Sequence, residues 1–258
     1  MHDLAGESVL IAAGGRSILL QRADPQIGHG VADHSNFAQR PLDRLNGTLS
    51  YVYAIACGTT AEAAHAAARV SRAHKPVQSD GTGAGPAYSA YTPQLQLWVA
   101  ATLYDSAITM YELIYGPLDE KEADAIYLQY AELGTALQVP PGLWPANRAD
   151  FAVYWQRRLG ELATDAATRS VARALLHSPT GPLWLKLGMP FARFMTIGLL
   201  PPRVRDLFEL PWSPAAERRF QRTLGVIRTV YPTLPERMRH WPKNHYLRSL
   251  RASMAAVG

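Results

Sequence analysis

The chain has one cysteine, Cys57, among its 258 residues. A single thiol excludes an internal disulfide and a cysteine-rich metal site, and it agrees with the reducing cytoplasm that we expect as the location. The first residues, MHDLAGESVLIAAGG, lack the basic start and long apolar run of a signal peptide.

Long hydrophobic runs are also missing, because no stretch of about 18 uncharged apolar residues occurs. The closest, LWVAATLYDSAITMYELIYG, is interrupted by Asp105 and Glu112. We therefore predict that this segment is a buried core helix rather than a membrane span.

Charge is modest, with a net value of +5 and 18% charged residues against 48% hydrophobic ones. This composition is typical of a globular protein and not of a disordered one. The basic residues are scattered, so we expect no nucleic-acid partner. Between residues 203 and 251 bases alternate with apolar residues, which predicts amphipathic helices and leaves a peripheral membrane contact open.

Hydrophobic residues recur mainly at the helical period, and long alternating Val/Ile-rich strands are absent. We predict an all-α fold with a single globular multi-helix domain over residues 1–258. Residues 4–20 fit either two short helices or a hairpin broken at Gly14-Gly15. The expected helices cover residues 41–56, Thr59 (a Thr-x-x-Glu capping box) to Pro76, 94–115, 120–137, 148–162, 166–177, a short segment after Pro201-Pro202, 214–230, 233–240 and 243–255. Residues 181–198 are apolar, and a short helix over residues 26–33 is one reading of a loop-rich segment.

Three motifs that suggest chemistry are incomplete. QSDGTGAGPAYSAY is rich in glycine, but no strand precedes it and Pro86 takes the place of a third glycine. Glu62 and His65 form one Glu-x-x-His, whereas a di-iron bundle needs two copies. No Gly-x-Ser-x-Gly elbow supports a hydrolase.

Two neighbouring predicted helices carry a more complete pattern. On the first, Arg44 and Thr48 are four residues apart and share a face. On the second, small and apolar residues lead along one face to an imidazole, in the order Ala63, Ala67, Val70, His74. Such a surface suits a flat haem with His74 on the iron and Arg44 and Thr48 near a propionate or bound oxygen. From the residues alone, the simpler interpretation is a helix–helix contact that ends in a histidine at the negative helix terminus.

A loop-rich segment before these helices contains Asp24, His29 and His34, spaced by five residues. The three side chains either line a pocket or stabilise the loop.

Several segments resemble a family of haem proteins that includes the rubber oxygenases (latex-clearing proteins) and the oxygenase of mycophenolic acid biosynthesis. Each segment is short, but together they span nearly the whole chain in family order. They are GESVLIAAGGRSILLQ, ADPQIGHGVADHS, RPLDRLNGTLSYVYAIACGT, ARVSRAHKPV, YSAYTPQLQLWVAATLYDS and GLLPPRVRDLFELPWSP.

The resemblance implies an all-α fold that encloses haem b. It implies that His74 is the proximal iron ligand and that Arg44 and Thr48 line the haem pocket. Arg69 and Arg72, which match the basic positions before the histidine, are expected near the propionates.

The sequence departs from the family at three positions. Gly47 stands where rubber oxygenases carry a lysine, Asp24-Pro25 replaces a His-Pro, and Ala100 replaces the histidine of a Trp-Val-His. We therefore expect a rebuilt distal side and do not carry over polyisoprene cleavage. His29 is an extra imidazole, expected to face the distal pocket or to be a sixth iron ligand, and His34 lies in the same segment.

From these residues we expect a haem-dependent oxidoreductase, most simply an oxygenase that uses dioxygen or peroxide on a small apolar or isoprenoid-like substrate. A haem-binding sensor or carrier without turnover is the alternative from another class. A helical protein that has lost its cofactor is a third reading.

Overall fold

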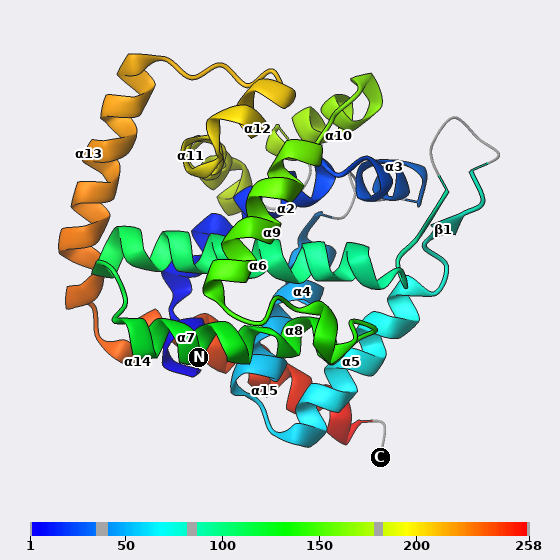
Figure 1. Ribbon diagram of the computed structural model, residues 1–258. Coiled ribbons are helices and arrows are strands. Elements are labelled where there is room, and N and C mark those ends of the chain that lie inside the picture. Colours follow the sequence, from blue (N-terminus) through cyan, green and yellow to red (C-terminus); the bar gives the residue numbers. More distant parts are fainter. Residues whose placement is uncertain (1, 35–40, 82–86, 178–182, 257–258) are drawn as a thin grey trace.

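The computed structural model describes residues 2–34, 41–81, 87–177 and 183–256. Most of these residues are helical, which confirms the predicted all-α class (Figure 1). The first helices are α1 (His2–Gly6), α2 (Gly14–Arg22), α3 (Pro25–His34), α4 (Pro41–Cys57), α5 (Thr60–His74) and α6 (Pro93–Tyr115).

The second half continues in the same way, with short connections between the helices. Most of the predicted boundaries agree with the observed ones to within a few residues. The helices are α7 (Glu120–Tyr130), α8 (Glu132–Thr135), α9 (Arg148–Glu161), α10 (Ala166–Leu176), α11 (Leu183–Leu199), α12 (Pro202–Leu207), α13 (Pro214–Val230), α14 (Glu236–Arg239) and α15 (Trp241–Ala255), with 3₁₀ turns at Ser8–Ala13, Pro141–Leu143 and Tyr231–Thr233.

The N-terminal apolar segment forms helices, so the hairpin alternative is wrong. Gly14 and Gly15 begin α2 instead of forming a turn. At Gly15 a Cβ atom would lie 2.0 Å from Oγ1 of Thr196 on α11. Glycine is therefore needed here because the two helices approach closely.

Two strands were not predicted. Gln78–Ser79 (β1) and Tyr88–Ser89 (β2) pair antiparallel, with Gln78 opposite Ser89 and Ser79 opposite Tyr88. Two residues per strand are too few for an alternating pattern to be recognised in the sequence.

The single helix expected over residues 120–137 is also wrong, because it divides at Ala131 into α7 and α8. The carbonyl of Leu133, inside the short α8, accepts a hydrogen bond of 2.7 Å from the hydroxyl of Tyr51 on α4.

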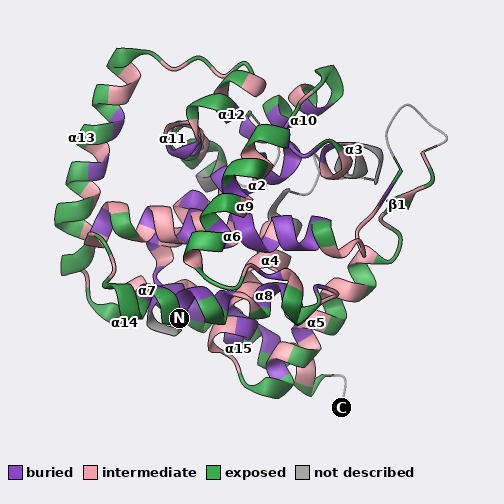
Figure 2. Ribbon diagram, in the orientation of Figure 1, coloured by how far each residue is buried: buried purple, intermediate pink, exposed green. Residues whose placement is uncertain are grey.

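Helix α6 crosses the middle of the fold, and Figure 2 shows buried residues along much of it. Trp98, Ala101 and Met110 are fully buried. This confirms the predicted core helix. Across the described ranges, a search for helices with the length and hydropathy of a bilayer span finds none.

A buried ion pair joins three helices around α6. Nη2 of Arg16 lies 2.5 Å from a carboxylate oxygen of Asp105, and the two side chains are 5% and 20% exposed. The same guanidinium donates to Ser106 Oγ at 2.8 Å and to the Leu199 carbonyl at 2.9 Å. One cation from α2 therefore fixes both α6 and the end of α11.

We expect Arg16→Met to lower the free energy of unfolding by about 3–5 kcal/mol, because Asp105 would remain largely buried without its cation. Urea unfolding followed by circular dichroism measures the loss. Arg148→Met is the matched control: it breaks a more exposed pair with Asp124 and should cost at most about 1 kcal/mol. Equal losses in the two variants would contradict a special role for the buried pair.

Candidate functional site

Helices α4 and α5 pack against each other, as the shared-face pattern predicted. The half-buried residues Ala63, Ala67 and Val70 contact the core cluster that includes Tyr51 and Ala54 of α4. His74 ends this row as the last residue of α5 and is also half-buried. The apolar face therefore leads to an imidazole at the helix end.

The first turn of α5 is held by a capping box. Thr59 Oγ1 accepts from the Glu62 amide, and the Glu62 carboxylate accepts from the Thr59 amide at 2.8 Å. Arg251 of α15 donates its Nε to the other oxygen of Glu62 at 2.5 Å. This hydrogen bond is the main reason that the pKa of Glu62 is lowered, since burial acts against it.

These contacts give Glu62 a structural role and weaken the Glu-x-x-His interpretation. Within the ranges that the structure describes, no group of three or more His, Cys, Asp and Glu side chains is arranged to hold a metal ion. A di-iron centre thus has no support from Glu62 and His65.

The last turn of α5 is held by two other segments. The Tyr91 hydroxyl donates to the Ser71 carbonyl at 2.7 Å, and the Gln138 side chain donates to Ser71 Oγ at 3.1 Å. Gln138 is itself fixed on α6, because its amide donates to Gln96 Oε1 at 2.9 Å. The helix turn that carries His74 is therefore tied to α6 and to the segment after α8.

The chain turns directly after His74. The Val77 amide donates to the His74 carbonyl at 2.9 Å, and the Val77 carbonyl accepts from the Ala90 amide at 2.9 Å. His74 therefore lies where α5, the β1–β2 hairpin and the approach to α6 meet.

Among the described side chains of α4, those before Tyr51 are less covered than those after it. Thr48 and Gly47 are half-buried, whereas Tyr51 and Ala54 are buried. A Cβ atom built on Gly47 would have no heavy atom of the described residues within 4 Å. Arg44 is part of α4, but its side chain lies outside the described residues.

Arg69 and Arg72 are exposed on α5 and are not on the row that ends in His74. The structure does not bring these two side chains to the α4 side of the helix. Arg69 and Arg72 would therefore contact the propionates of a haem only at the outer edge of that group.

His29 has a protein partner. Its Nε2 lies 2.8 Å from Asp165 Oδ2 at the start of α10. The backbone hydrogen bond from Thr168 is the main cause that lowers the pKa of Asp165, and His29 adds to it. An Nε2 that faces a carboxylate at this distance is not placed to bind iron, so the sixth-ligand hypothesis for His29 loses its support.

The segment around His29, read from the sequence as loop-rich or as a short helix over residues 26–33, is helix α3. Asp24 accepts from the amides of Gln26 and Ile27 at the start of α3, and it pairs with Arg158 at 2.5 Å. Of the two readings of Asp24 and His29, stabilisation of the local structure is the one that these contacts support. The side chain of His34 lies outside the described residues.

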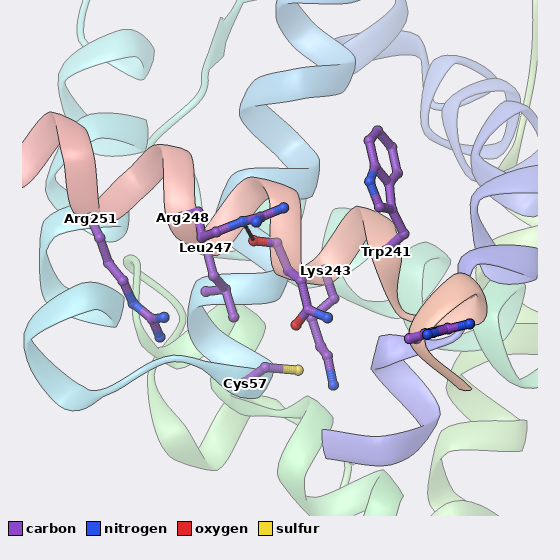
Figure 3. Close-up of a pocket in the computed structure, with 8 residues that line it drawn as sticks. Cys57, Trp241, Lys243, Leu247, Arg248 and Arg251 are labelled. Carbon is purple, nitrogen blue, oxygen red and sulfur yellow. Dashed lines mark hydrogen bonds between the residues drawn. The ribbon is translucent and has the colours of Figure 1, made fainter. Parts of the chain in front are cut away.

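A basic hollow was not identified from the sequence. It has a volume of about 530 Å³ and is bounded by α14, α15 and the end of α4 (Figure 3). Figure 3 shows Lys243, Leu247 and Arg251 extending from α15 on the side of Cys57. Its lining residues are Cys57, Arg237, Trp241, Lys243, Asn244, Leu247, Arg248 and Arg251.

This basic hollow is separate from His74. It meets α5 in the first turn, where Arg251 contacts Glu62. His74 is twelve residues further along, which corresponds to about 18 Å at the helical rise. The spacing of bases on α15 was the available signal, but their convergence with Arg237 and Cys57 depends on the tertiary fold.

Comparison with known proteins gives a match to one family model over residues 3–229, described as "ER-bound oxygenase mpaB/B'/Rubber oxygenase, catalytic domain". An uncharacterised protein of Mycobacterium tuberculosis (strain H37Rv) is 38% identical over 227 residues, which is 86% of this chain and 88% of the relative. An uncharacterised protein of Mycobacterium bovis has the same identity and coverage. No solved structure matches the chain significantly.

Glu62→Gln should lower the free energy of unfolding at pH 7 by about 1–2 kcal/mol, because the cap and the pair with Arg251 are weakened. The folded-state pKa of Glu62 is lowered from 4.5. The Glu62 carboxylate therefore makes its full contribution to the free energy of unfolding above pH 4.5. This contribution is lost as the pH falls through the lowered pKa. Urea unfolding at several pH values should show the difference between the two proteins shrinking as the pH falls below 4.5. A difference that persists unchanged in acid, or an equal loss in the exposed control Glu132→Gln, would contradict this.

Gly47→Ala should raise the free energy of unfolding by about 0.5–1 kcal/mol, because alanine favours the helix and no described atom obstructs its methyl group. Gly58→Ala is the matched control, since its Cβ would lie 2.5 Å from the Ala54 carbonyl oxygen. Thermal unfolding compares the two. A destabilised Gly47→Ala protein would show that the space beside Gly47 is filled.

Proposed function

Because the chain belongs to the family of MpaB-type and rubber oxygenase catalytic domains, we propose that it is a haem b-dependent oxygenase with His74 as the iron ligand. The observation that carries this proposal is the position of His74. It is a half-buried imidazole at the end of a face of small side chains, in a turn held by Tyr91 and Gln138.

The residues present fit a haem. Ala63 and Ala67 pack against the core cluster, whereas a Cβ built on Gly47 meets no described heavy atom within 4 Å, which would leave room for a flat group beside α4. A histidine imidazole is a common protein ligand of haem iron, and His74 would supply it.

In this proposal His74 holds the iron, and Arg44 and Thr48 of α4 hold the rest of the group, with Arg69 and Arg72 at its outer edge. The haem would supply the redox chemistry that activates dioxygen or peroxide towards a small apolar or isoprenoid-like substrate.

The chain's own residues do the positioning. The hydrogen bonds to Ser71 hold the last turn of α5, so the backbone that carries the His74 imidazole is fixed before any ligand binds. The Thr48 hydroxyl and the Arg44 guanidinium provide a hydrogen bond and a positive charge for a propionate or for polarised oxygen. The apolar residues of α4 and α5 exclude water and select the substrate by shape.

Polyisoprene cleavage is not part of the proposal. The lysine of rubber oxygenases is replaced by Gly47. At the position of the family's second histidine, Ala100 is 2% exposed and packs in the core cluster. Each change removes an ionisable side chain of the rubber-oxygenase pattern.

Titration of the purified protein with haemin tests the proposal. His74→Ala should weaken haemin binding by at least roughly tenfold and change the Soret spectrum, because the protein–iron bond is lost. His65→Ala is the matched control on the same helix and should bind as the unaltered protein does. His29→Ala should leave the ferric spectrum unchanged, since its Nε2 faces Asp165. An unaltered protein that does not take up haemin, or a His74→Ala spectrum that does not differ, would overturn the assignment.

A further inference from the structure

Helix α11 presents large apolar side chains to solvent. Leu183, Leu187 and Phe191 are 71%, 72% and 53% exposed. Their spacing of four residues places them in one row on the helix. The other end of the same helix is anchored, because Met195 and Leu199 are buried in a core cluster. The exposed row is therefore the outer face of a helix that is fixed to the fold.

An apolar groove continues this row towards α13. It has a volume of about 550 Å³, and Phe191 belongs both to the row and to the groove. Arg219 of α13 lies over the ring of Phe194, with its guanidinium carbon 4.4 Å from the ring centroid. The residues lining the groove are Pro190, Phe191, Arg193, Phe194, Ile197, Pro211, Trp212, Ala216, Arg219 and Thr223.

Positive charge is concentrated on the same two helices. Together α11 and α13 carry six basic residues and one acid, Glu217. Glu217 accepts hydrogen bonds from Trp212 and Gln221. Among the described residues, none of the six bases makes an ion pair with a carboxylate. The six are Lys186, Arg193, Arg218, Arg219, Arg222 and Arg228.

The positive charge of α11 and α13 indicates which kind of partner covers the row of Leu183, Leu187 and Phe191. A second copy of the chain would bring two faces of the same positive sign together, which repel each other. An anionic bilayer offers an apolar interior to the leucines and phenylalanine and phosphates to the bases. A helix that carries Leu and Phe beside Lys and Arg is typical of segments that lie in the membrane interface.

We propose that the surface formed by α11 and α13 docks on a membrane that contains anionic phospholipid. Leu183, Leu187 and Phe191 enter the interface, and the bases of the two helices contact the lipid phosphates. This docking uses no residue of the proposed haem site, so it stands or falls separately from the proposed function.

Co-sedimentation of the full chain with vesicles tests the docking. We expect binding to phosphatidylcholine vesicles that contain phosphatidylglycerol and little binding to pure phosphatidylcholine. Raising the salt concentration from about 0.1 M to about 1 M shortens the screening length from about 10 Å to about 3 Å and should weaken the binding. Absence of binding to the anionic vesicles overturns the proposal.

Matched variants locate the contact. Leu187→Ser with Phe191→Ser should weaken vesicle binding by at least roughly tenfold. Leu128→Ser with Val153→Ser removes side chains of similar exposure from α7 and α9 and should leave binding unchanged. Arg218→Gln with Arg222→Gln should weaken binding, whereas Arg237→Gln with Arg248→Gln at the basic hollow should have little effect.

Two results would overturn the assignment to this face. One is an equal loss in the test and control pairs, which would indicate non-specific attraction of a basic protein. The other is a dimer in sedimentation velocity that the Leu187 and Phe191 substitutions dissolve, without vesicle binding by the unaltered chain. That result would show that a second copy covers the row. Circular dichroism of each variant confirms that the helices are retained.

Discussion

The ion pair between Arg16 and Asp105 is the constraint on which the arrangement of the helices depends. A charge taken out of water is costly unless its partners are placed well, and Arg16 satisfies this condition only when α2, α6 and the end of α11 are in position. The contact of Gly15 with Thr196 requires the same close approach. Because α6 is held in this way, Gln96 in its first turn is a fixed acceptor for the backbone amide of Gln138. The side chain of Gln138 in turn holds Ser71 in the last turn of α5.

The position of His74 follows from that support. Helix α5 is tied at its first turn by Thr59 and Arg251 and at its last turn by Tyr91 and Gln138. All four contacts are between protein groups, so the fold itself orders the helix end that carries the imidazole. A ligand that is ordered before binding loses less conformational entropy when it binds. The same bonds explain why Glu62 belongs to the scaffold, although its sequence motif also suggested a metal ligand.

The sequence was most informative where structure is local. Caps and prolines set the bounds of α4, α5, α6 and α9 correctly, because these signals act within a few residues. The partner of His29 lies far away in the chain, and no local pattern reveals it. The spacing of Ala63, Ala67 and Val70 predicted their common face correctly, and the structure packs that face against the core. The ion pair of Arg16 was not predicted, because a single base in an apolar segment gives no indication that Asp105 is its partner.

The replacement at Gly47 bears on the choice between an oxygenase and a passive haem carrier. A lysine at this position in rubber oxygenases provides an amine able to cap the iron, whereas glycine provides no side chain. His29 in the preceding helix is engaged with Asp165 through its Nε2. If the proposed function holds, neither a side chain at position 47 nor Nε2 of His29 would compete with an external ligand, as an oxygenase requires and a closed carrier does not.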